Sequence, residues 1–361
     1  MVNKKYEVAL VVGTRPNFIK AAPLLKYFEE KNINTFFIHT GQHKDKKMSS
    51  NIFYDLNIRP PDITLETPTV NMNEQLSYML NALDEVFNEY KFERVGVFGD
   101  VTSTLAASLV AKNKQTELFH VEAGLRSQNL EMPEERNRII VDSISDLLFA
   151  PSDDAVQNLI DENIDNEKIF SVGNIMIDTL KNNYEKIKSG TPKIIQKLKI
   201  DNNYFVTTIH RPSNLTDENL NSIFTSLNKF TDRFNVILPA HPRLKNYIDT
   251  NQIKLNNISI VDPMSYVDFL SLVNGSSLVL TDSGGLQEET TFMNINCLTL
   301  REETERPITV EQGTNKVVGL NPENIISEIN NSLKGKLPNE NKIKNWDGNT
   351  SERIFNILYK K

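Results

Sequence analysis

The 361-residue sequence lacks most of the features that assign a chain to a class at first sight. It has one cysteine, Cys297, so no intrachain disulfide can form. That cysteine lies in the apolar run 295–300, which favours a buried structural thiol over a nucleophile. There is no low-complexity tract, and a content of 39% hydrophobic and 24% charged residues is typical of a soluble globular protein.

Positive charge is also scarce. The net charge of −7 argues against a general nucleic-acid binder, so an anionic substrate needs a local cluster of donors. No apolar run is long enough to span a bilayer, and the first one, 8–12, has only the length of a strand and lacks a cleavage signature. These features fit a cytoplasmic enzyme with neither a nucleic-acid nor a membrane partner.

Several cofactor and catalytic signatures are absent as well. No Gly-x-Gly-x-x-Gly opens a helix, so the fingerprint of a nicotinamide cofactor is missing. The sequence contains no Asp-x-Asp, no His-Glu-x-x-His and no pair of cysteines, and the Gly-x-Ser-x-Gly turn of serine hydrolases is missing too. We therefore expect no metal and no cofactor.

What the chain does contain is a regular alternation of short apolar runs with longer helical patterns. Because the strands are apolar throughout, the pattern predicts parallel sheets covered by helices on both faces. It occurs twice, on either side of the Lys-, Asn- and Thr-rich stretch 181–203, and so predicts two doubly wound α/β domains with a cleft between them. The strand candidates are 6–12, 34–39, 94–98, 117–121, 147–150, 169–172, 204–209, 235–239, 258–261, 278–281 and 297–300; the helix candidates are 18–31, 73–90, 103–112, 134–144, 153–162, 216–231, 266–274, 286–293, 322–332 and 349–359.

Polar motifs follow many of these strands, where ligands bind in doubly wound sheets. Ser283-Gly284-Gly285 comes directly after the strand 278–281 and opens a helix. Free backbone N–H groups and the helix dipole favour a phosphate there, and the glycines leave room for its approach. Glu289, farther along the same helix, is placed to reach polar groups of that ligand. A tight turn with a good N-cap accounts for the motif equally well.

Carboxylates occupy three comparable positions in the first half. Asp100 and Glu122 end predicted strands, and Glu134 opens a helix. Carboxylates tuned by a closed site exchange protons, so the three are candidates for general acid–base chemistry. Structural alternatives stand beside this interpretation: Asp100 suits the N-cap of the next helix, and Glu134 with Glu135 suits the positive end of a helix dipole.

Basic and polar residues also follow strands. Arg15 and Lys20 come after the first strand. His210 follows the predicted strand 204–209 and stands directly before an arginine. This grouping of basic residues at strand ends favours contact with a diphosphate. Structural polar residues at a domain edge are the alternative. Gln42 and His43, in the loop after the second strand, are typical of a hydrogen-bonded structural pair rather than of a catalytic one.

In their order along the chain, these motifs resemble those of the non-hydrolysing UDP-N-acetylglucosamine (UDP-GlcNAc) 2-epimerases. The resemblance covers roughly residues 6–320 and implies a GT-B-like fold of two Rossmann-like doubly wound domains with an interdomain active-site cleft. The implied domains are 1–175, completed by a C-terminal helix at 347–361, and 176–346, which binds UDP. The matching motifs are Gly13-Thr-Arg-Pro, Thr40-Gly-Gln-His, Gly99-Asp, His120-Val-Glu-Ala-Gly-Leu-Arg, Pro133-Glu-Glu, His210-Arg, Asp282-Ser-Gly-Gly and Glu305-Arg-Pro.

The resemblance implies that the enzyme interconverts UDP-GlcNAc and UDP-ManNAc by eliminating UDP to a 2-acetamidoglucal and adding it back. It needs no cofactor and no metal, and its products supply surface polysaccharide or glycan synthesis; we expect a homodimer. The implied acid/base carboxylates are Asp100, Glu122 and Glu134. The implied binding groups are Arg15, Lys20 and the catalytic His210 at the departing diphosphate; Ser283, Gly284 and Gly285 at the phosphates; Glu289 at the ribose; Arg306 on the nucleotide side; and the backbone of Phe269 at the uracil.

Other functions remain open within this fold. A related branch that acts on UDP-2,3-diacetamido-glucuronate has Gln-Phe-Ile where this chain has Asn17-Phe-Ile, whereas Glu305-Arg-Pro keeps the pattern of the UDP-GlcNAc enzymes. A GT-B glycosyltransferase would share the phosphate site but would not need the three carboxylates, and a hydrolysing epimerase would release free ManNAc. Bacterial members also bind UDP-GlcNAc as an activator near the Gln-His loop, which makes Gln42 and His43 candidate allosteric residues, although the segment 62–72 differs.

Overall fold

The computed structural model describes residues 4–42, 52–68, 70–240, 242–251, 253, 255, 257–335 and 343–360. The chain divides into two compact units, Met1–Asn182 with Lys344–Lys361 (unit 1) and Asn183–Ile343 (unit 2). The division falls within the helix α7 (Ile175–Lys197), a few residues beyond the predicted boundary at 175. No helix in the described ranges is both long and apolar enough to cross a membrane.

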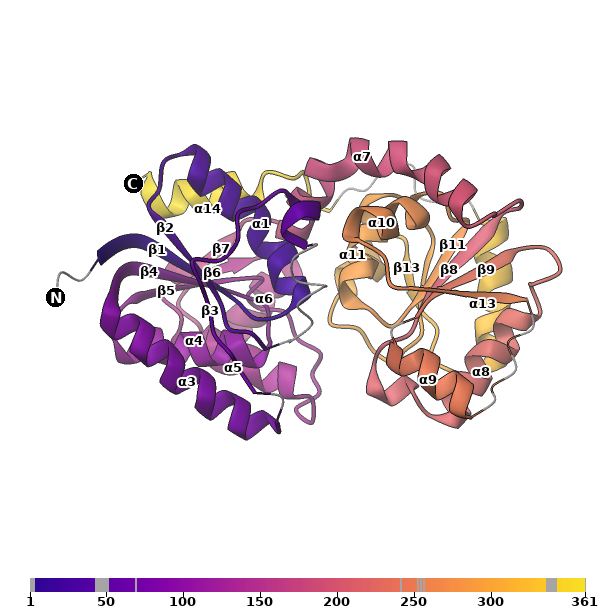
Figure 1. The fold of residues 1–361 in the computed structure, drawn as a ribbon, viewed down its shortest axis with the longest axis horizontal. Helices are drawn as coiled ribbons and strands as arrows, with labels where there is room; N and C mark the ends of the chain where they lie inside the picture. The colour runs from indigo at the N-terminus through magenta and orange to yellow at the C-terminus, as the bar shows by residue number, and fades with distance from the viewer. Residues whose placement is uncertain are drawn as a thin grey trace. The chain divides into compact units, whose positions relative to one another are not determined.

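Unit 1 is built on a parallel sheet that has seven strands among the described residues, in the order β3-β2-β1-β4-β5-β6-β7 (Figure 1). The order reverses between β1 and β4, which pair in parallel with Val11 opposite Val97. In a doubly wound sheet such a reversal opens the crevice in which ligands bind, at the carboxyl ends of the strands. The strands are β1 (Lys4–Val12), β2 (Thr35–His39), β3 (Ile63–Thr64), β4 (Tyr90–Phe98), β5 (Glu117–Val121), β6 (Leu147–Ala150) and β7 (Ile169–Ser171).

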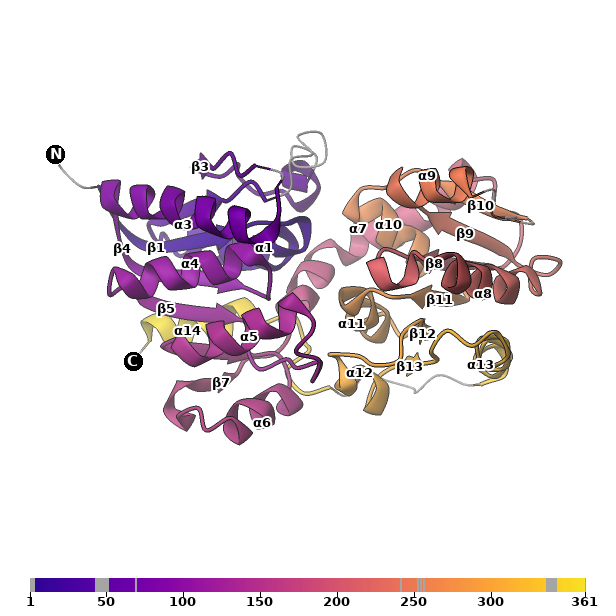
Figure 2. The same cartoon turned by 90° about the horizontal axis from the view of Figure 1, so that it is seen from below.

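Helices cover both faces of this sheet. α3, α4 and α5 lie side by side on one face, and α1 and α14 lie together on the other (Figures 1 and 2). The Phe355 ring of α14 packs on Tyr27 and Phe28 of α1, so the C-terminal helix is part of unit 1. The helices are α1 (Arg15–Glu30), α3 (Met72–Glu89), α4 (Thr102–Asn113), α5 (Pro133–Ile144), α6 (Asp153–Asp161), the 3-10 helix η1 (Asn166–Lys168), the first part of α7, and α14 (Thr350–Tyr359).

Unit 2 repeats the same plan with six parallel strands among its described residues, in the order β10-β9-β8-β11-β12-β13. Here the order reverses between β8 and β11. The strands are β8 (Tyr204–Thr208), β9 (Asn235–Pro239), β10 (Ile258–Val261), β11 (Leu278–Thr281), β12 (Cys297–Thr299) and β13 (Asn315–Val317). The helices are η2 (Pro212–Asn214), α8 (Asp217–Asn228), α9 (Pro242–Thr250), α10 (Tyr266–Asn274), α11 (Gly284–Phe292), α12 (Pro307–Glu311) and α13 (Pro322–Lys334).

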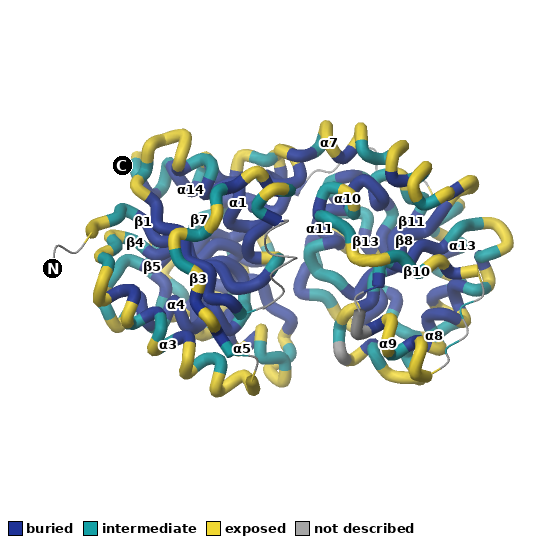
Figure 3. Tube along the Cα trace, viewed as in Figure 1, coloured by how far each residue is buried: buried dark blue, intermediate teal, exposed yellow. Residues whose placement is uncertain are grey.

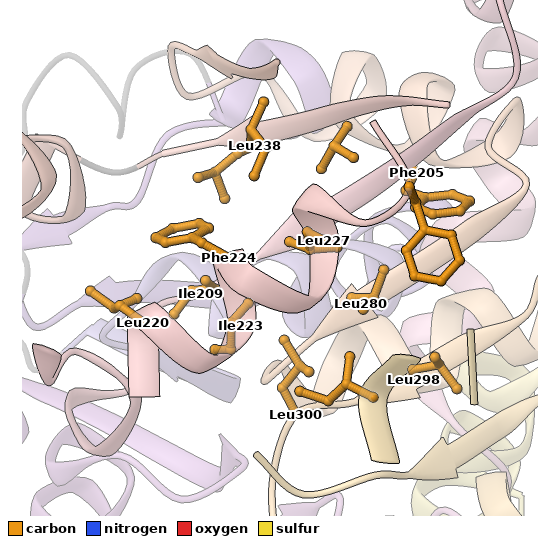
Figure 4. Close-up of a cluster of buried hydrophobic side chains, with 14 of the residues drawn as sticks. Phe205, Ile209, Leu220, Ile223, Phe224, Leu227, Leu238, Leu280, Leu298 and Leu300 are labelled. Carbon is orange, nitrogen blue, oxygen red and sulfur yellow. The ribbon is translucent and has the colours of Figure 1, made fainter. Parts of the chain in front are cut away.

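The core of unit 2 shows how the helices are held on the sheet. One side of α8 carries apolar residues three and four positions apart, the spacing that forms one face of a helix. These side chains pack on apolar residues of the strands below (Figure 4). Burying each of them contributes about 1.5–3 kcal/mol, so the apolar face fixes α8 in place. The contact joins Leu220, Ile223, Phe224 and Leu227 to Phe205, Leu238, Leu280, Leu298 and Leu300. In both units the central strands are buried over most of their length, the edge strands β3, β7 and β10 are only partly buried, and exposed positions lie mainly on helices and loops (Figure 3).

Two parallel sheets with alternating helices confirm the predicted α/β fold class. The prediction that 181–203 is a break between elements is wrong, because α7 continues to Lys197. Leu180, Ile187 and Ile194 recur at helical spacing and are buried, whereas the lysines between them lie on the outer face. Because it contains Gly190 and Pro192, this segment has a composition typical of a linker, and for that reason the helix was not predicted. The short strands β3 and β13 and the helices α9 and α12 were not predicted.

Candidate functional site

The candidate residues of unit 1 lie at the carboxyl ends of β1, β4 and β5, beside the reversal of strand order. Arg15 begins α1 directly after β1, and Lys20 follows in the second turn of that helix. Asp100 lies in the turn after β4, and Glu122 directly follows β5. Parallel strands end at one edge of their sheet, so three separate segments of sequence supply one group of residues.

Glu122 combines burial with an unusual backbone conformation. Its φ is +75°, which costs a residue other than glycine about 1–3 kcal/mol. Its side chain is 5% exposed, and its carboxylate pairs with the ammonium group of Lys20. The backbone is held there because Glu122 N and Ala123 N both donate to Phe149 O of the neighbouring strand β6. Strain retained at a buried carboxylate beside a cation is typical of a functional group.

Gly99 brings the turn after β4 against this ion pair. Its φ is +63°, and a Cβ atom there would lie 2.8 Å from Lys20 Nζ and 3.3 Å from Glu122 Oε2. Gly99 N donates to Val121 O, the last residue of β5. Only glycine allows both this conformation and this close approach.

Asp100 faces a cation of its own. Its carboxylate pairs with the guanidinium of Arg138, a buried residue of α5, and its backbone oxygen accepts a hydrogen bond of 2.8 Å from Asn137 Nδ2. The N-cap of α4 is Val101, so the capping alternative considered for Asp100 does not hold. Two carboxylates, each with its own cationic partner, therefore lie on neighbouring turns.

The two glutamates that open α5 differ in their surroundings. Glu134 is exposed and forms no hydrogen bond or ion pair with any residue that the structure describes, so the dipole interpretation fits its position. Glu135 is buried, binds Arg138 at 2.8 Å and accepts from Ser127 N and Gln128 N. The i, i+3 spacing of Glu135 and Arg138 was the available signal for this pair.

Gln42 has a structural contact at the beginning of α4. Its Oε1 accepts a hydrogen bond of 2.6 Å from Ser103 Oγ and one of 3.3 Å from Ser103 N. This contact satisfies one of the free N–H groups of a helix N-terminus. His43, the other candidate allosteric residue, lies outside the described residues.

In unit 2, Asp282 organises the turns after β8 and β11. It is wholly buried and accepts hydrogen bonds from His210 N, Arg211 N and Asn214 Nδ2, and His210 Nδ1 lies 2.5 Å from its carboxylate. Burial alone would raise the pKa of Asp282, but the His210 ring and the two backbone N–H groups hold it below its usual value. The ionised carboxylate thus fixes the ring orientation of His210, whose side chain is 55% exposed.

The helix α11 begins at the predicted phosphate motif. Ser283 is its N-cap residue, and Ser283 N donates to Thr281 Oγ1 at 2.9 Å. Gly284 and Gly285 form the first turn, where N–H groups have no partner within the helix and the dipole attracts anions. A Cβ atom on Gly284 would lie 2.8 Å from Glu305 Oε1, so glycine is needed there as well.

Three arginines lie near the beginning of α11, of which Arg301 and Arg306 are buried and Arg211 is partly exposed. Glu305 binds Arg211 at 3.0 Å and Arg301 at 2.6 Å, and Arg306 binds Glu288 at 2.6 Å. The three guanidinium groups are matched by three carboxylates once Asp282, which accepts from Arg211 N, is counted with Glu305 and Glu288. These guanidinium groups and the N–H groups at the beginning of α11 are the local donors that an anionic ligand needs in a chain that is acidic as a whole.

Glu289 and Phe269 lie on two helices that contact each other. Glu289 of α11 is buried and accepts a hydrogen bond of 2.8 Å from Tyr266 Oη of α10. Burial and the neighbouring carboxylate raise the pKa of Tyr266. Phe269, one turn along α10, is half-buried, and its N–H donates to Ser265 O.

Comparison with known proteins identifies the family. The UDP-N-acetylglucosamine 2-epimerase family model matches residues 26–359. The UDP-N-acetylglucosamine 2-epimerase of Methanococcus maripaludis is 36% identical over 364 residues, which cover 98% of each chain. The chain belongs to the UDP-N-acetylglucosamine 2-epimerase family.

Two further members of the family bear on the fold and on the substrate. The crystal structure of the Methanocaldococcus jannaschii UDP-GlcNAc 2-epimerase, in complex with UDP-GlcNAc and UDP, is similar with a TM-score of 0.89 and 36% identity, covering 98% of this chain and 99% of that one. The UDP-2,3-diacetamido-2,3-dideoxy-D-glucuronate 2-epimerase of Pseudomonas aeruginosa is 35% identical over 359 residues, covering 98% of this chain and 99% of that protein. Family membership and the GT-B-like fold class are thus confirmed.

Sequence reasoning missed several groups around the candidate residues of this family member. Arg138, Glu135 and Asp282 each hold a candidate residue or its turn in place. Arg301 and Glu305 lie in an acid–base alternation that is typical of a solvated surface, yet both are buried. In the sequence, only their position directly after the strand β12 indicated that Arg301 and Glu305 have a role other than that of surface residues.

Proposed function

We propose that the chain is a non-hydrolysing UDP-GlcNAc 2-epimerase, which interconverts UDP-GlcNAc and UDP-ManNAc. The observation that carries the proposal is the pair of buried or partly buried carboxylates, Glu122 with Lys20 and Asp100 with Arg138, on adjacent strand ends. The N-terminus of α11, with its two glycines, and the three arginines near it in unit 2 support it.

The chemistry explains why two proton-carrying groups are needed. No carbonyl activates the C2 proton of the sugar, so simple deprotonation and reprotonation would be very slow. In elimination, a carboxylate takes the C2 proton, the C1–C2 double bond forms, and the C1–O bond breaks to release UDP. In re-addition, a phosphate oxygen of UDP attacks C1 while a second group delivers a proton to the opposite face of C2.

The proposed roles follow from the surroundings of each residue. Glu122 and Asp100 take and return the proton, and Glu134 is the third proposed carboxylate of the family pattern. Lys20, Arg15 and His210 stabilise the diphosphate as its negative charge develops. The other proposed nucleotide contacts are Ser283, Gly284 and Gly285 for the phosphates, Glu289 for the ribose, Arg306 for the nucleotide side and the Phe269 backbone for the uracil.

A second candidate function is the epimerisation of UDP-2,3-diacetamido-glucuronate. It is favoured by the 35% identity to the Pseudomonas aeruginosa enzyme, which is close to the value for the UDP-GlcNAc enzymes. For either substrate we propose a cytoplasmic homodimer that works without a cofactor. Its product would supply surface polysaccharide or glycan synthesis.

The test is to incubate the protein with UDP-GlcNAc in D2O, without an acceptor, and to follow the sugar by proton NMR. UDP-ManNAc with deuterium at C2 is the expected product. Free ManNAc with UDP would instead indicate a hydrolysing enzyme. An unchanged substrate would contradict the UDP-GlcNAc assignment, and turnover of UDP-2,3-diacetamido-glucuronate in the same assay would establish the second candidate.

A further inference from the structure

A buried histidine lies beneath the two proposed catalytic carboxylates and has no role in the chemistry described so far. His120 belongs to β5, two residues before Glu122, and its side chain is fully buried. Nδ1 lies 2.6 Å from Asp142 Oδ1, and Nε2 lies 2.8 Å from Gly99 O. A carbonyl oxygen and an ionised carboxylate can only accept, so both ring nitrogens must donate. With Asp142 ionised, either neutral tautomer would leave a ring lone pair facing an acceptor, so this geometry favours an imidazolium ion.

Asp142 is ionised in this arrangement. Besides His120, it accepts from Gly124 N at 3.0 Å and binds the guanidinium of Arg126 at 2.8 Å. Burial alone would raise the pKa of Asp142, but His120 and Arg126 together hold it below its usual value. Arg126 also binds Glu162, at the end of α6, with hydrogen bonds of 2.6 and 2.7 Å.

The charges of this cluster balance. His120 and Arg126 supply two positive charges, and Asp142 and Glu162 supply two negative charges. A buried ion is tolerated when it is both paired and fully hydrogen-bonded. The cluster meets both conditions, so a charged imidazole is stable in the core of unit 1.

The two outer ends of the cluster lie in the turns that carry the carboxylates. His120 holds Gly99 O, the residue before Asp100, and Asp142 holds Gly124 N, two residues after Glu122. Both glycines have positive φ, of +63° and +82°. Glycine turns have little conformational preference of their own, so external hydrogen bonds decide their geometry.

We propose that His120 is a positioning residue: an imidazolium ion that, through Asp142, ties the turn before Asp100 to the turn after Glu122. It contacts neither carboxylate directly and acts through Gly99 and Asp142. The consequence for rate rests on the proposed function, whereas the charge state and the hydrogen bonds do not.

The charge state is tested on the intact chain labelled with 15N-histidine. The sequence has five histidines, and His120 is assigned as the signal that disappears in His120→Gln. At about pH 7.5, one histidine should show protons on both ring nitrogens, protected from exchange by burial. In Asp142→Asn the same ring should lose one of these protons, because the acceptor charge is gone. A wild-type His120 with one bare ring nitrogen would overturn the proposal.

The positioning role is tested with two variants that each keep half of the contact. The amide of His120→Gln can still reach Gly99 O, and that of His120→Asn can still reach Asp142. Both should lower kcat about 10- to 100-fold, because a displacement near 1 Å costs up to about 100-fold. The Kd for UDP should change by less than about threefold. The control is His39→Gln, a buried histidine at the end of β2, which should keep the wild-type kcat in the folded protein.

The outcomes separate this inference from the proposed function. If the wild-type protein does not epimerise its substrate but its His120 is doubly protonated, the proposed function is contradicted and the inference about the charged cluster stands. An active wild-type protein whose His120→Gln and His120→Asn variants keep full kcat would overturn the positioning role. If neither variant folds, His120 is assigned instead as the histidine whose ring signals change in Asp142→Asn, and the wild-type spectrum then decides the charge state on which the proposal depends.

Discussion

Gly99→Ala tests the Lys20–Glu122 pair without altering any atom of it. The new Cβ would lie 2.8 Å from Lys20 Nζ and 3.3 Å from Glu122 Oε2. Ordinary contacts begin near ~3.5 Å, so the ammonium group must retreat by roughly 0.7 Å and disturb the ion pair. The substitution therefore displaces the groups that we propose to carry and balance the proton.

The cost in stability can be estimated and matched by a control. Alanine at the φ of +63° costs about 1–2 kcal/mol, which for a unit of about 200 residues lowers the Tm by about 2–8 °C. Gly348→Ala is the control in the same unit: its φ is +75°, and its Cβ would meet the chain of the exposed Lys181. Lys181 must shift to admit this atom, which disturbs its hydrogen bond of 2.7 Å to Asp347 O, so the control should lose at least as much stability as Gly99→Ala.

The two variants should differ in rate. A displacement of this size is expected to lower kcat about 10- to 100-fold in Gly99→Ala, whereas Gly348→Ala keeps the wild-type kcat. Conversion of UDP-GlcNAc to UDP-ManNAc by proton NMR gives the rate, circular dichroism gives the Tm, and calorimetry with UDP checks that binding is retained. Equal kcat in the two variants would refute the role assigned to the pair.

Four further predictions follow from single residues. Glu122→Gln should abolish turnover and change the Kd for UDP less than about threefold. The control Glu117→Gln, at the other end of β5, should keep turnover, and equal loss of turnover and binding in Glu122→Gln would indicate a structural role. Ser283→Ala should weaken UDP binding in calorimetry by about 1 kcal/mol or more, and unchanged affinity would remove its hydroxyl from the phosphate site. The lowered pKa of Asp282 means that its stabilisation is complete above the unfolded value of about 3.9 and is lost as the pH falls through the lower folded value. Acid unfolding below about pH 4 should therefore be shallower in Asp282→Asn, and an unchanged acid profile would contradict this. Burial raises the pKa of Cys297 to about 12, so Ellman's reagent should react only with the unfolded protein; rapid reaction of the native chain would show that the thiol is accessible.

The fold was predictable where local pattern and tertiary environment agree. The runs 117–121, 235–239 and 278–281 are strands with the predicted bounds, because most residues of a strand buried on both faces are apolar. α7 was missed because one buried side chain in every three or four is enough to hold a helix, and Gly190 and Pro192 obscured that spacing. β3 has only two residues, too few for any periodicity.

The candidate site was predictable as a set of strand ends but not as a set of contacts. Asp100 suits an N-cap in sequence, and only the position of α5 beside the sheet brings Arg138 to it. Two adjacent glutamates open α5, and the packing of the helix decides that Glu135 is buried and Glu134 exposed. Neighbours in sequence point in different directions, so their environments cannot be read from local pattern.

The sequence by itself determined the alternation of elements, the parallel sheets, the phosphate motif at the beginning of a helix and the family. It also placed the carboxylates at strand ends, because strand boundaries are local features. The tertiary structure decided which charges are paired and which backbone groups are held. His120 shows the reason: its partners, Gly99 and Asp142, lie about twenty residues away on either side, and only the pairing of β4 with β5 and the packing of α5 bring them to its two ring nitrogens.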